Sequence, residues 1–423
     1  MKFECTAGFA KKLDEMDPLR TYRSEFYIPR HQNKPCIYLT GNSLGLQPKG
    51  TASALEQELQ DWRRYGVEGH FQAKNPWFNY HHRLTKSLCL LTGAKLSEVV
   101  AMNQLTVNLN LLLISFYRPS GKKKKILIEA NAFPSDRFAC QSHLRLHKQH
   151  PEKDLLELPL EKDAATHTTE GIIRYLEEYS GEIALFLLGG VNYYSGQFFD
   201  LKSIATACRR LNISFGVDLA HAIGNVPLKL HEWGVDFATW CSYKYLNSGP
   251  GGVSGIFVHE RHHGNKTLSR LEGWWGNKEK TRFKMGKIFD AETGAAAWQM
   301  SNAPVLSMAA HKASLEIFDH VGMPALRKKS IMLTGYLIWL LKDIQQKKPG
   351  SGFSLITPEN STERGCQVSI RVPSRGREIF SKLTESGVIA DWREPDVIRV
   401  APVPLYNSYT DVYRFARIFL DAL

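Results

Sequence analysis

The chain has 423 residues, more than the roughly 250–300 at which a single hydrophobic core stops growing, so its length predicts two domains. Apolar residues make up 43% and charged residues 23%, a composition that excludes intrinsic disorder, collagen and small disulfide scaffolds. Lysine and arginine (54) outnumber aspartate and glutamate (42), which gives a net charge of +12. That charge suits nucleic acid, an anionic membrane surface or an acidic small molecule, and by itself it does not choose among them.

The seven cysteines are scattered and form no C-x-x-C pair, which predicts reduced thiols and no metal site. Residues 1–17 are mixed and charged, without the apolar stretch of a secretory signal. The longest apolar run, 109–117, falls far short of the ~20 residues that a membrane span needs. We therefore expect a cytoplasmic protein without a membrane partner.

Helical and strand-like segments alternate from residue 48 to about 260. Helical periodicity covers 48–65 and 76–91, with Pro76 in a first turn and Gly93 beyond the end. A strand at 99–102 precedes a helix over 107–117, for which Thr106 is the expected N-cap.

The second half of this region continues the alternation. A strand at 126–128 leads through 133–136 into a helix running towards residue 150. Four more apolar runs have the length of buried strands: 183–188, 213–217, 237–241 and 253–258. This pattern predicts an α/β fold, with a mainly parallel sheet between layers of helices.

Near Pro304 the pattern changes to long helices, 309–321 and 326–346, followed by strands at 367–372 and 397–400. We therefore predict a large domain over 46–304 and a smaller α+β C-terminal domain over 305–423. The N-terminal segment 1–45 is expected to join the small domain.

Four consecutive lysines, residues 122–125, stand directly before the strand at 126–128. A solvated loop feeding a buried strand is the favoured interpretation. A non-enzymatic, nucleic-acid-binding protein is the alternative, but it needs basic residues interleaved with aromatic ones on one face, and here the basic residues are dispersed.

Polar residues that follow buried strands mark the ligand-binding edge of an open α/β sheet. Asp218 and His221 follow the strand at 213–217, and Lys244 follows the strand at 237–241, just before a glycine-rich segment. An aspartate at one strand end and a lysine at the next commonly hold pyridoxal phosphate, where the lysine forms a Schiff base and the carboxylate pairs with the pyridine nitrogen.

The phosphate of such a cofactor needs its own site. Leu105 and Thr106 at a helix start offer backbone N–H groups, a hydroxyl and the positive end of a helix dipole. Phe133, in a strand-to-helix turn, is placed to stack on a pyridine ring, although a single phenylalanine is more often a core residue.

Five motifs, in order along the chain, resemble kynureninase, and the resemblance extends from about residue 19 to the C-terminus. The motifs are Gly-Asn-Ser-Leu-Gly-Leu-Gln-Pro at 41–48, Phe-Pro-Ser-Asp at 133–136, Val-Asp-Leu-Ala-His-Ala at 217–222, Trp-Cys-Ser-Tyr-Lys-Tyr-Leu-Asn at 240–247, and Arg-Val-Ala-Pro-Val-Pro-Leu-Tyr-Asn-Ser at 399–408.

This resemblance implies a pyridoxal-phosphate enzyme of fold type I, related to class V aminotransferases, with a seven-stranded type of sheet. It implies a homodimer whose active site lies at the subunit boundary. The implied reaction hydrolyses the Cβ–Cγ bond of L-kynurenine or 3-hydroxy-L-kynurenine to anthranilate or 3-hydroxyanthranilate and L-alanine. Such an enzyme serves tryptophan breakdown or NAD precursor synthesis.

The resemblance also implies residue roles, with Lys244 as the Schiff-base lysine and with Tyr243 and Trp274 reaching the cofactor phosphate. Tyr243 is in addition our candidate general acid/base. The residues implied around the cofactor are Leu105, Thr106, Phe133, Pro134, Ser135, Asp136, Asp218, His221, Tyr243, Lys244, Trp274 and Asn302. Those implied around the substrate are Ser43, His70, Asn302 and Arg399. Arg399 resembles the arginine that grips the α-carboxylate, and Trp274 and Asn302 resemble residues that reach across the dimer interface.

One position departs from the family pattern. Many kynureninases have a serine or threonine hydroxyl after the strand at 183–188, where this chain has Gly189 and Gly190. A cysteine desulfurase or selenocysteine lyase remains the alternative enzyme, but it needs a reactive cysteine on a loop near the substrate, which none of the seven obviously supplies.

Overall fold

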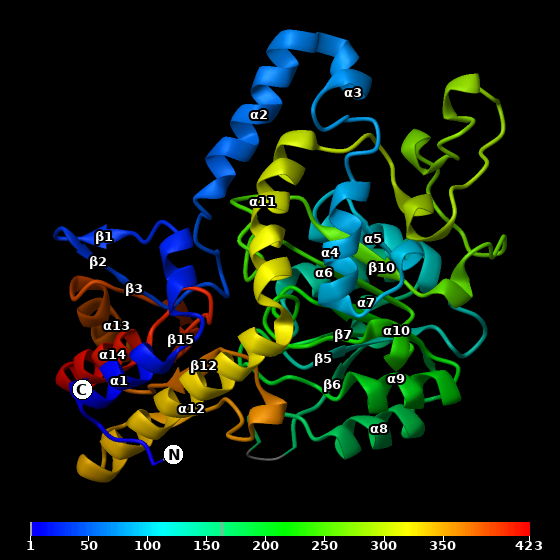
Figure 1. Ribbon diagram of the computed structural model, residues 1–423. Coiled ribbons are helices and arrows are strands. Elements are labelled where there is room, and N and C mark those ends of the chain that lie inside the picture. The colour runs from blue at the N-terminus through cyan, green and yellow to red at the C-terminus, as the bar shows by residue number, and fades with distance from the viewer. Residues whose placement is uncertain (1, 162–163) are drawn as a thin grey trace.

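A seven-stranded sheet lies at the centre of the larger part of the molecule, with helices packed against it (Figure 1). The computed structural model describes residues 2–161 and 164–423, so the first residue of the predicted N-terminal segment lies outside the described part. The strand order is β4-β10-β9-β8-β7-β5-β6. Strand β10 runs antiparallel to both neighbours, and the other pairs are parallel. The predicted α/β class with a mainly parallel sheet is confirmed.

The strands of this sheet follow the apolar runs of the sequence. Their bounds are β4 Val99–Ala101, β5 Lys125–Glu129, β6 Leu155–Leu158, β7 Ile183–Gly189, β8 Ser214–Asp218, β9 Phe237–Trp240 and β10 Gly255–Val258. Alternate side chains of β7 enter different clusters: Phe186 and Leu188 join one, and Leu185 and Leu187 join the other. Both faces of the sheet are therefore buried, as the continuous apolar runs predicted.

Helices connect these strands, and two of them begin at places that the sequence analysis did not predict. The helices of this region are α2 Gly50–Tyr65, α3 Gly69–Gln72, α4 His82–Thr92, α5 Leu105–Phe116, α6 Pro134–Leu146, α7 Pro151–Asp154, α8 Thr169–Glu178, α9 Leu201–Arg210 and α10 Leu230–Trp233. Helix α4 begins six residues after Pro76, so the expected start there is wrong, whereas Gly93 is its left-handed C-cap as expected. Thr106 is also not an N-cap, because α5 already begins at Leu105 after Gln104.

A smaller body contains both chain termini (Figure 1). Its elements are α1 Ala7–Met16, β1 Arg30–His31, β2 Lys34–Pro35, β3 Ile37–Tyr38, α12 Met323–Lys347, β11 Ser354–Leu355, β12 Val368–Arg371, α13 Gly376–Glu385, β13 Val388–Ile389, β14 Asp391–Arg393, β15 Val397–Val400 and α14 Tyr409–Ala422. Strands β11, β12, β15 and β14 form a sheet in that order, and β3 pairs with β13.

Helix α11, Val305–Val321, packs against α2, and its Leu315 belongs to the core cluster of the seven-stranded sheet. Leu326 at the start of α12 belongs to the same cluster, and from Leu333 onward α12 belongs to the core of the smaller body. Residues from α1 and β3 complete that second core. The domain limits at residues 45 and 304 stay a prediction.

The lysine run before β5 is engaged with the protein itself. Lys123 donates to the backbone oxygens of Leu211 and Asn212, both at 2.7 Å. Lys124 pairs with Asp154 at 3.4 Å, and Lys125 pairs with Glu182. These contacts favour the interpretation of a loop feeding a strand. Within the described residues, no helix is long and apolar enough to cross a membrane.

Candidate active site

Nine of the predicted site residues line one cavity, of about 160 Å³, at the carboxyl ends of strands β5, β7 and β8. The lining residues are Leu105, Thr106, Glu129, Phe133, Ser135, Asp136, Gly189, Val191, Tyr193, Asp218, Ala220, His221, Tyr243 and Lys244. Pro134 opens helix α6 between two of them. Because these residues come from strand ends and helix starts, the cavity lies where ligands bind in open α/β sheets.

Lys244 projects into this cavity from the segment after β9. Its Nζ lies 3.0 Å from Nε2 of His221. Burial, and then the charge of Lys244, hold the pKa of His221 well below its usual value. His221 is therefore a neutral imidazole whose Nε2 accepts a hydrogen bond from the Lys244 amine.

Three carboxyl groups share the cavity with that lysine. Asp218 is the last residue of β8, and its Oδ1 accepts a hydrogen bond from the backbone N–H of Ala220 at 2.7 Å. Burial, and then the neighbouring Asp218, hold the pKa of Asp136 well above its usual value. Burial also raises the pKa of Glu129, to about 7, and the charge of Asp218 adds to the rise. Burial raises the pKa of Asp218 as well, but the N–H of Ala220, the charge of Lys244 and a hydrogen bond from Asp136 act against the rise. Within this pair Asp218 is therefore the carboxylate better placed to pair with a cationic ring nitrogen.

Glu129 occupies the space beside Gly189, the position that departs from the family pattern. Its Oε2 accepts a hydrogen bond from Asn192 Nδ2 at 2.8 Å. A Cβ atom on Gly189 would lie 2.9 Å from Glu129 Oε1, closer than real Cβ contacts come. The glycine thus leaves room for a buried carboxyl group where many kynureninases have a hydroxyl.

A helix start and an aromatic ring complete the cavity. Leu105 and Thr106 form the first turn of α5, a twelve-residue helix without a side-chain N-cap hydrogen bond. Such a turn presents backbone N–H groups and a positive dipole end to an anion. The Phe133 ring centroid lies 5.7 Å from Lys244 Nζ and 5.2 Å from the Tyr193 ring. Burial, and then Cys241, raise the pKa of Tyr243, so its hydroxyl keeps its proton.

Arg399 and Ser43 meet outside this cavity, at Asp391. The guanidinium of Arg399 donates to Asp391 from Nε at 3.2 Å and from Nη2 at 2.7 Å. Its Nη1 donates to the backbone oxygen of Tyr193 at 2.6 Å, and Ser43 Oγ also donates to Asp391. The sequence analysis missed Asp391, Glu129 and Tyr193; only Glu129 directly follows a strand-forming apolar run, the signal used for Asp218.

Comparisons with known proteins decide the family. Kynureninase from Flavobacterium johnsoniae is 49% identical over 418 residues, which cover 99% of this chain and 98% of that protein. Kynureninase from Koribacter versatilis is 50% identical over 422 residues, which cover 100% of this chain and 99% of that protein. The family of the kynureninase C-terminal domain matches residues 326–419. The chain belongs to the kynureninase family.

Solved structures of other enzymes share the fold. C-DES with glycine covalently linked to its PLP cofactor has a TM-score of 0.76 at 18% identity, covering 91% of this chain and 96% of that chain. The cysteine desulfurase CsdA from Escherichia coli has a TM-score of 0.72 at 16% identity, covering 96% and 98%. This likeness concerns the fold alone, and it confirms the fold type I architecture expected for a kynureninase.

The remaining predicted residues of this kynureninase-family chain lie elsewhere in the structure. Trp274 is 49% exposed, and its indole N–H donates to the backbone oxygen of Arg282, whereas the adjacent Trp275 is buried. Asn302 is exposed. His70 lies on α3, where its Nδ1 is 2.9 Å from the Val67 oxygen. Within a single chain these residues are not brought to Lys244.

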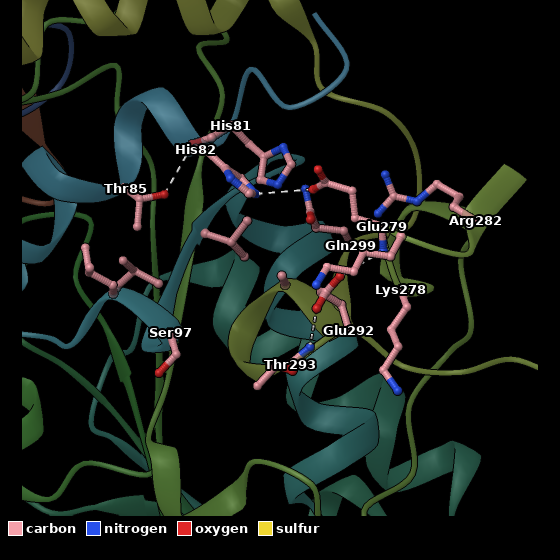
Figure 2. A pocket seen from close by; sticks show the side chains of 15 residues that line it. His81, His82, Thr85, Ser97, Lys278, Glu279, Arg282, Glu292, Thr293 and Gln299 are labelled. Carbon is pink, nitrogen blue, oxygen red and sulfur yellow. Dashed lines mark hydrogen bonds and ion pairs between the residues drawn. The ribbon is translucent and has the colours of Figure 1, made fainter.

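A larger cavity, of about 680 Å³, lies between α4 and the segment 278–299 (Figure 2). His82 faces Glu279 across it at 3.7 Å, and His81, Arg282 and Gln299 are nearly buried in its wall. None of the predicted cofactor residues lines it. Size therefore does not mark the active site here; the clustered carboxyl groups and the lysine do.

Proposed function

We propose that the protein is a pyridoxal-phosphate-dependent kynureninase. It hydrolyses the Cβ–Cγ bond of L-kynurenine, or of its 3-hydroxy form, to anthranilate or 3-hydroxyanthranilate and L-alanine. The observation that carries this proposal is identity of 49% and 50% to two kynureninases over nearly their full lengths. The convergence of nine predicted site residues on one cavity supports it.

The residues of the cavity fit pyridoxal phosphate. Lys244 supplies an amine for the aldehyde, Asp218 a buried carboxylate for the ring nitrogen, and Phe133 an aromatic face for the ring. The first turn of α5 and the Tyr243 hydroxyl provide hydrogen-bond donors for the phosphate. When bound, the cofactor supplies an electron sink for the bonds broken at the substrate.

The protein's own groups bind the substrate and move protons. With the cofactor bound, Lys244 would be the base that takes the proton from the substrate Cα. His221 steadies this amine without adding a charge, because its imidazole is neutral. Tyr243 keeps its proton and acts as the general acid/base at Cβ. Arg399 holds the substrate α-carboxylate, for which a planar, two-pronged guanidinium is suited.

Exposed apolar side chains support a homodimer. Six of them lie in two segments, 67–78 and 274–288, which contact each other through Phe78 and Phe283: Val67, Phe71, Trp274, Phe283, Met285 and Ile288, each 49–85% exposed. A patch of this kind marks an interaction surface. In a homodimer, this surface brings Trp274 and Asn302 to the partner's cavity.

Light scattering on purified protein tests the dimer. The expected mass is that of two chains, and Ile288→Glu should shift the protein towards one chain. Leu146→Glu is the matched control, because Leu146 is 72% exposed outside both segments and its change should leave the mass unaltered. A wild-type mass of one chain would refute the dimer.

Anthranilate release from L-kynurenine tests the reaction. The purified protein should be yellow with bound cofactor and should release anthranilate, and Lys244→Ala should lose both colour and turnover. Lys11→Ala, at a lysine on the surface of α1, should keep both. A coloured, active Lys244→Ala variant would sink the assignment. Release of alanine from L-cysteine without any from L-kynurenine would favour the desulfurase alternative.

A further inference from the structure

The guanidinium of Arg399 is already occupied by a carboxylate of the protein itself. Asp391 takes the Nε and Nη2 donors of Arg399, at 3.2 and 2.7 Å, in the paired geometry that a substrate carboxylate would use. The Arg399 side chain is 0% exposed, so nothing from solvent reaches it in this arrangement. A substrate carboxylate therefore has to displace Asp391 before Arg399 can bind it.

Asp391 has other partners that can still bind its carboxylate when it separates from Arg399. Arg393 Nε lies 3.0 Å from Asp391 Oδ1, and this arginine is 36% exposed. Ser43 Oγ donates to the same carboxylate. Asp391 begins β14, the three-residue edge strand of its sheet, which is bound on one side only. An edge strand is free to shift without breaking a second ladder of hydrogen bonds.

Tyr193 links Arg399 to the cavity of Lys244. Its backbone oxygen accepts from Arg399 Nη1 at 2.6 Å, and its ring packs on Phe133 in the cavity wall. Arg399 therefore lies directly behind a wall residue of the cavity. Burial raises the pKa of Asp391, but the charges of Arg399 and Arg393 and the hydrogen bonds from Arg399 and Ser43 together outweigh burial and hold that pKa below its usual value, so Asp391 is a carboxylate at neutral pH.

We propose that Asp391 is an internal competitor that occupies Arg399 in the free enzyme and sets the affinity for the substrate α-carboxylate. The proposal rests on the proposed function, because it assumes that Arg399 binds that carboxylate. Substrate binding exchanges one carboxylate for another on Arg399, while Arg393 and Ser43 retain Asp391. Ligands without a carboxylate do not take the place of Asp391 on Arg399, so Asp391 lowers the affinity for carboxylate ligands and leaves the affinity for their amides unchanged.

The test is binding of L-alanine to the cofactor-loaded enzyme, measured by calorimetry. If Arg399 is free about a tenth of the time, Asp391→Asn should lower the Kd about tenfold, because the competitor is gone. The same variant should unfold at a lower temperature, because it leaves the buried Arg399 unpaired. A residue that merely held Arg399 in place would give weaker binding instead, so an unchanged or higher Kd overturns the proposal.

Two controls separate this exchange from general electrostatics. Asp396→Asn makes the same charge change three residues before Arg399, at an acid paired with Arg371, and should leave the Kd within about twofold. L-Alaninamide, which has no carboxylate, should bind Asp391→Asn and wild type alike. Equal tightening in both aspartate variants, or equal tightening for the amide, overturns the proposal.

A second variant keeps the test decisive if Asp391→Asn fails to fold. Arg393→Gln removes the alternative partner of Asp391, so Asp391 stays longer on Arg399 and the Kd of L-alanine should rise about threefold, as for loss of one partly exposed ion pair. An unchanged or lower Kd contradicts the exchange. Anthranilate release is measured in parallel: its absence in wild type refutes the proposed function, whereas normal release with unchanged Kd values refutes only the role of Asp391.

Discussion

Glu129 gives a prediction whose size follows from its surroundings. The side chain is 4% exposed and lies beside Asp218, and its only polar contacts are with Asn192 and the Gly189 backbone among the described residues. Burial raises its pKa from an ordinary value of 4.5 to about 7. Replacing it by Gln keeps the shape and removes the ionisation.

The sign of the pH dependence follows from where the proton is bound. Between pH 4.5 and 7 the folded protein keeps the proton on Glu129, whereas the unfolded chain loses it, so the free energy of unfolding falls as the pH rises. Each pKa unit between the two states is worth about 1.4 kcal/mol, so the whole interval is worth about 3 kcal/mol. As the pH rises from 4.5 to 7, the free energy of unfolding of the wild type should therefore fall by about 3 kcal/mol relative to that of Glu129→Gln, and it should fall little more above pH 7.

Chemical denaturation of cofactor-free protein at fixed protein concentration, repeated between pH 4.5 and 8, measures this difference. Glu157→Gln is a control of opposite sign, because hydrogen bonds from Arg137 lower the pKa of Glu157. The contribution of Glu157 to the free energy of unfolding should be present above the ordinary glutamate pKa and should be lost as the pH falls below it. A stability difference between wild type and Glu129→Gln that is independent of pH would refute the reasoning.

Two further substitutions test the packing around the site and a buried contact between α12 and the end of α1. A Cβ on Gly45 would overlap the backbone oxygen of Lys244. Gly45→Ala should therefore lower the melting temperature and the rate of anthranilate release. Gly50→Ala is the control, because there is open space around Gly50, and it should change neither by much. Lys329 and Asp17 form a buried ion pair at 2.7 Å. Lys329→Met should lower the free energy of unfolding, measured by chemical denaturation, by about 3–5 kcal/mol, because it removes the partner of the buried Asp17. A loss below about 1 kcal/mol, the size expected for a surface ion pair, would contradict burial of this pair.

The sheet was predictable wherever a strand is buried on both faces, because only continuous apolar runs satisfy such a position. Strand β6 was missed for the opposite reason: it lies at the sheet edge, and its Leu155, Leu156 and Glu157 are partly or fully exposed. The start of α4 was misplaced because proline at a helix start is only a preference. Here Pro76 belongs to the loop before His82.

The cavity residues were predictable because a strand end fixes their place in the fold. Asp218 and Lys244 follow neighbouring strands, so the sheet alone brings them together. Asp391 gave no such signal, since it reaches Arg399 through pairing of β14 with β15 in the smaller sheet, and Asp and Arg in neighbouring strands are ordinary surface residues. Only the burial of Arg399 distinguishes this pair from a surface ion pair.

The net charge of +12 belongs to the whole chain and does not describe the charge inside the cavity of Lys244. Glu129, Asp136 and Asp218 line the cavity of Lys244. Among the described residues that line it, Lys244 is the single basic one apart from the neutral His221. The excess of basic residues therefore lies outside this cavity and does not itself hold an anion there. A phosphate in this cavity depends on directed hydrogen bonds from the first turn of α5, which the ionic strength of the medium screens far less than a distant surface charge. Cofactor retention should accordingly be nearly independent of salt, whereas the on-rate of the substrate, which the surface charge steers, should fall as salt rises.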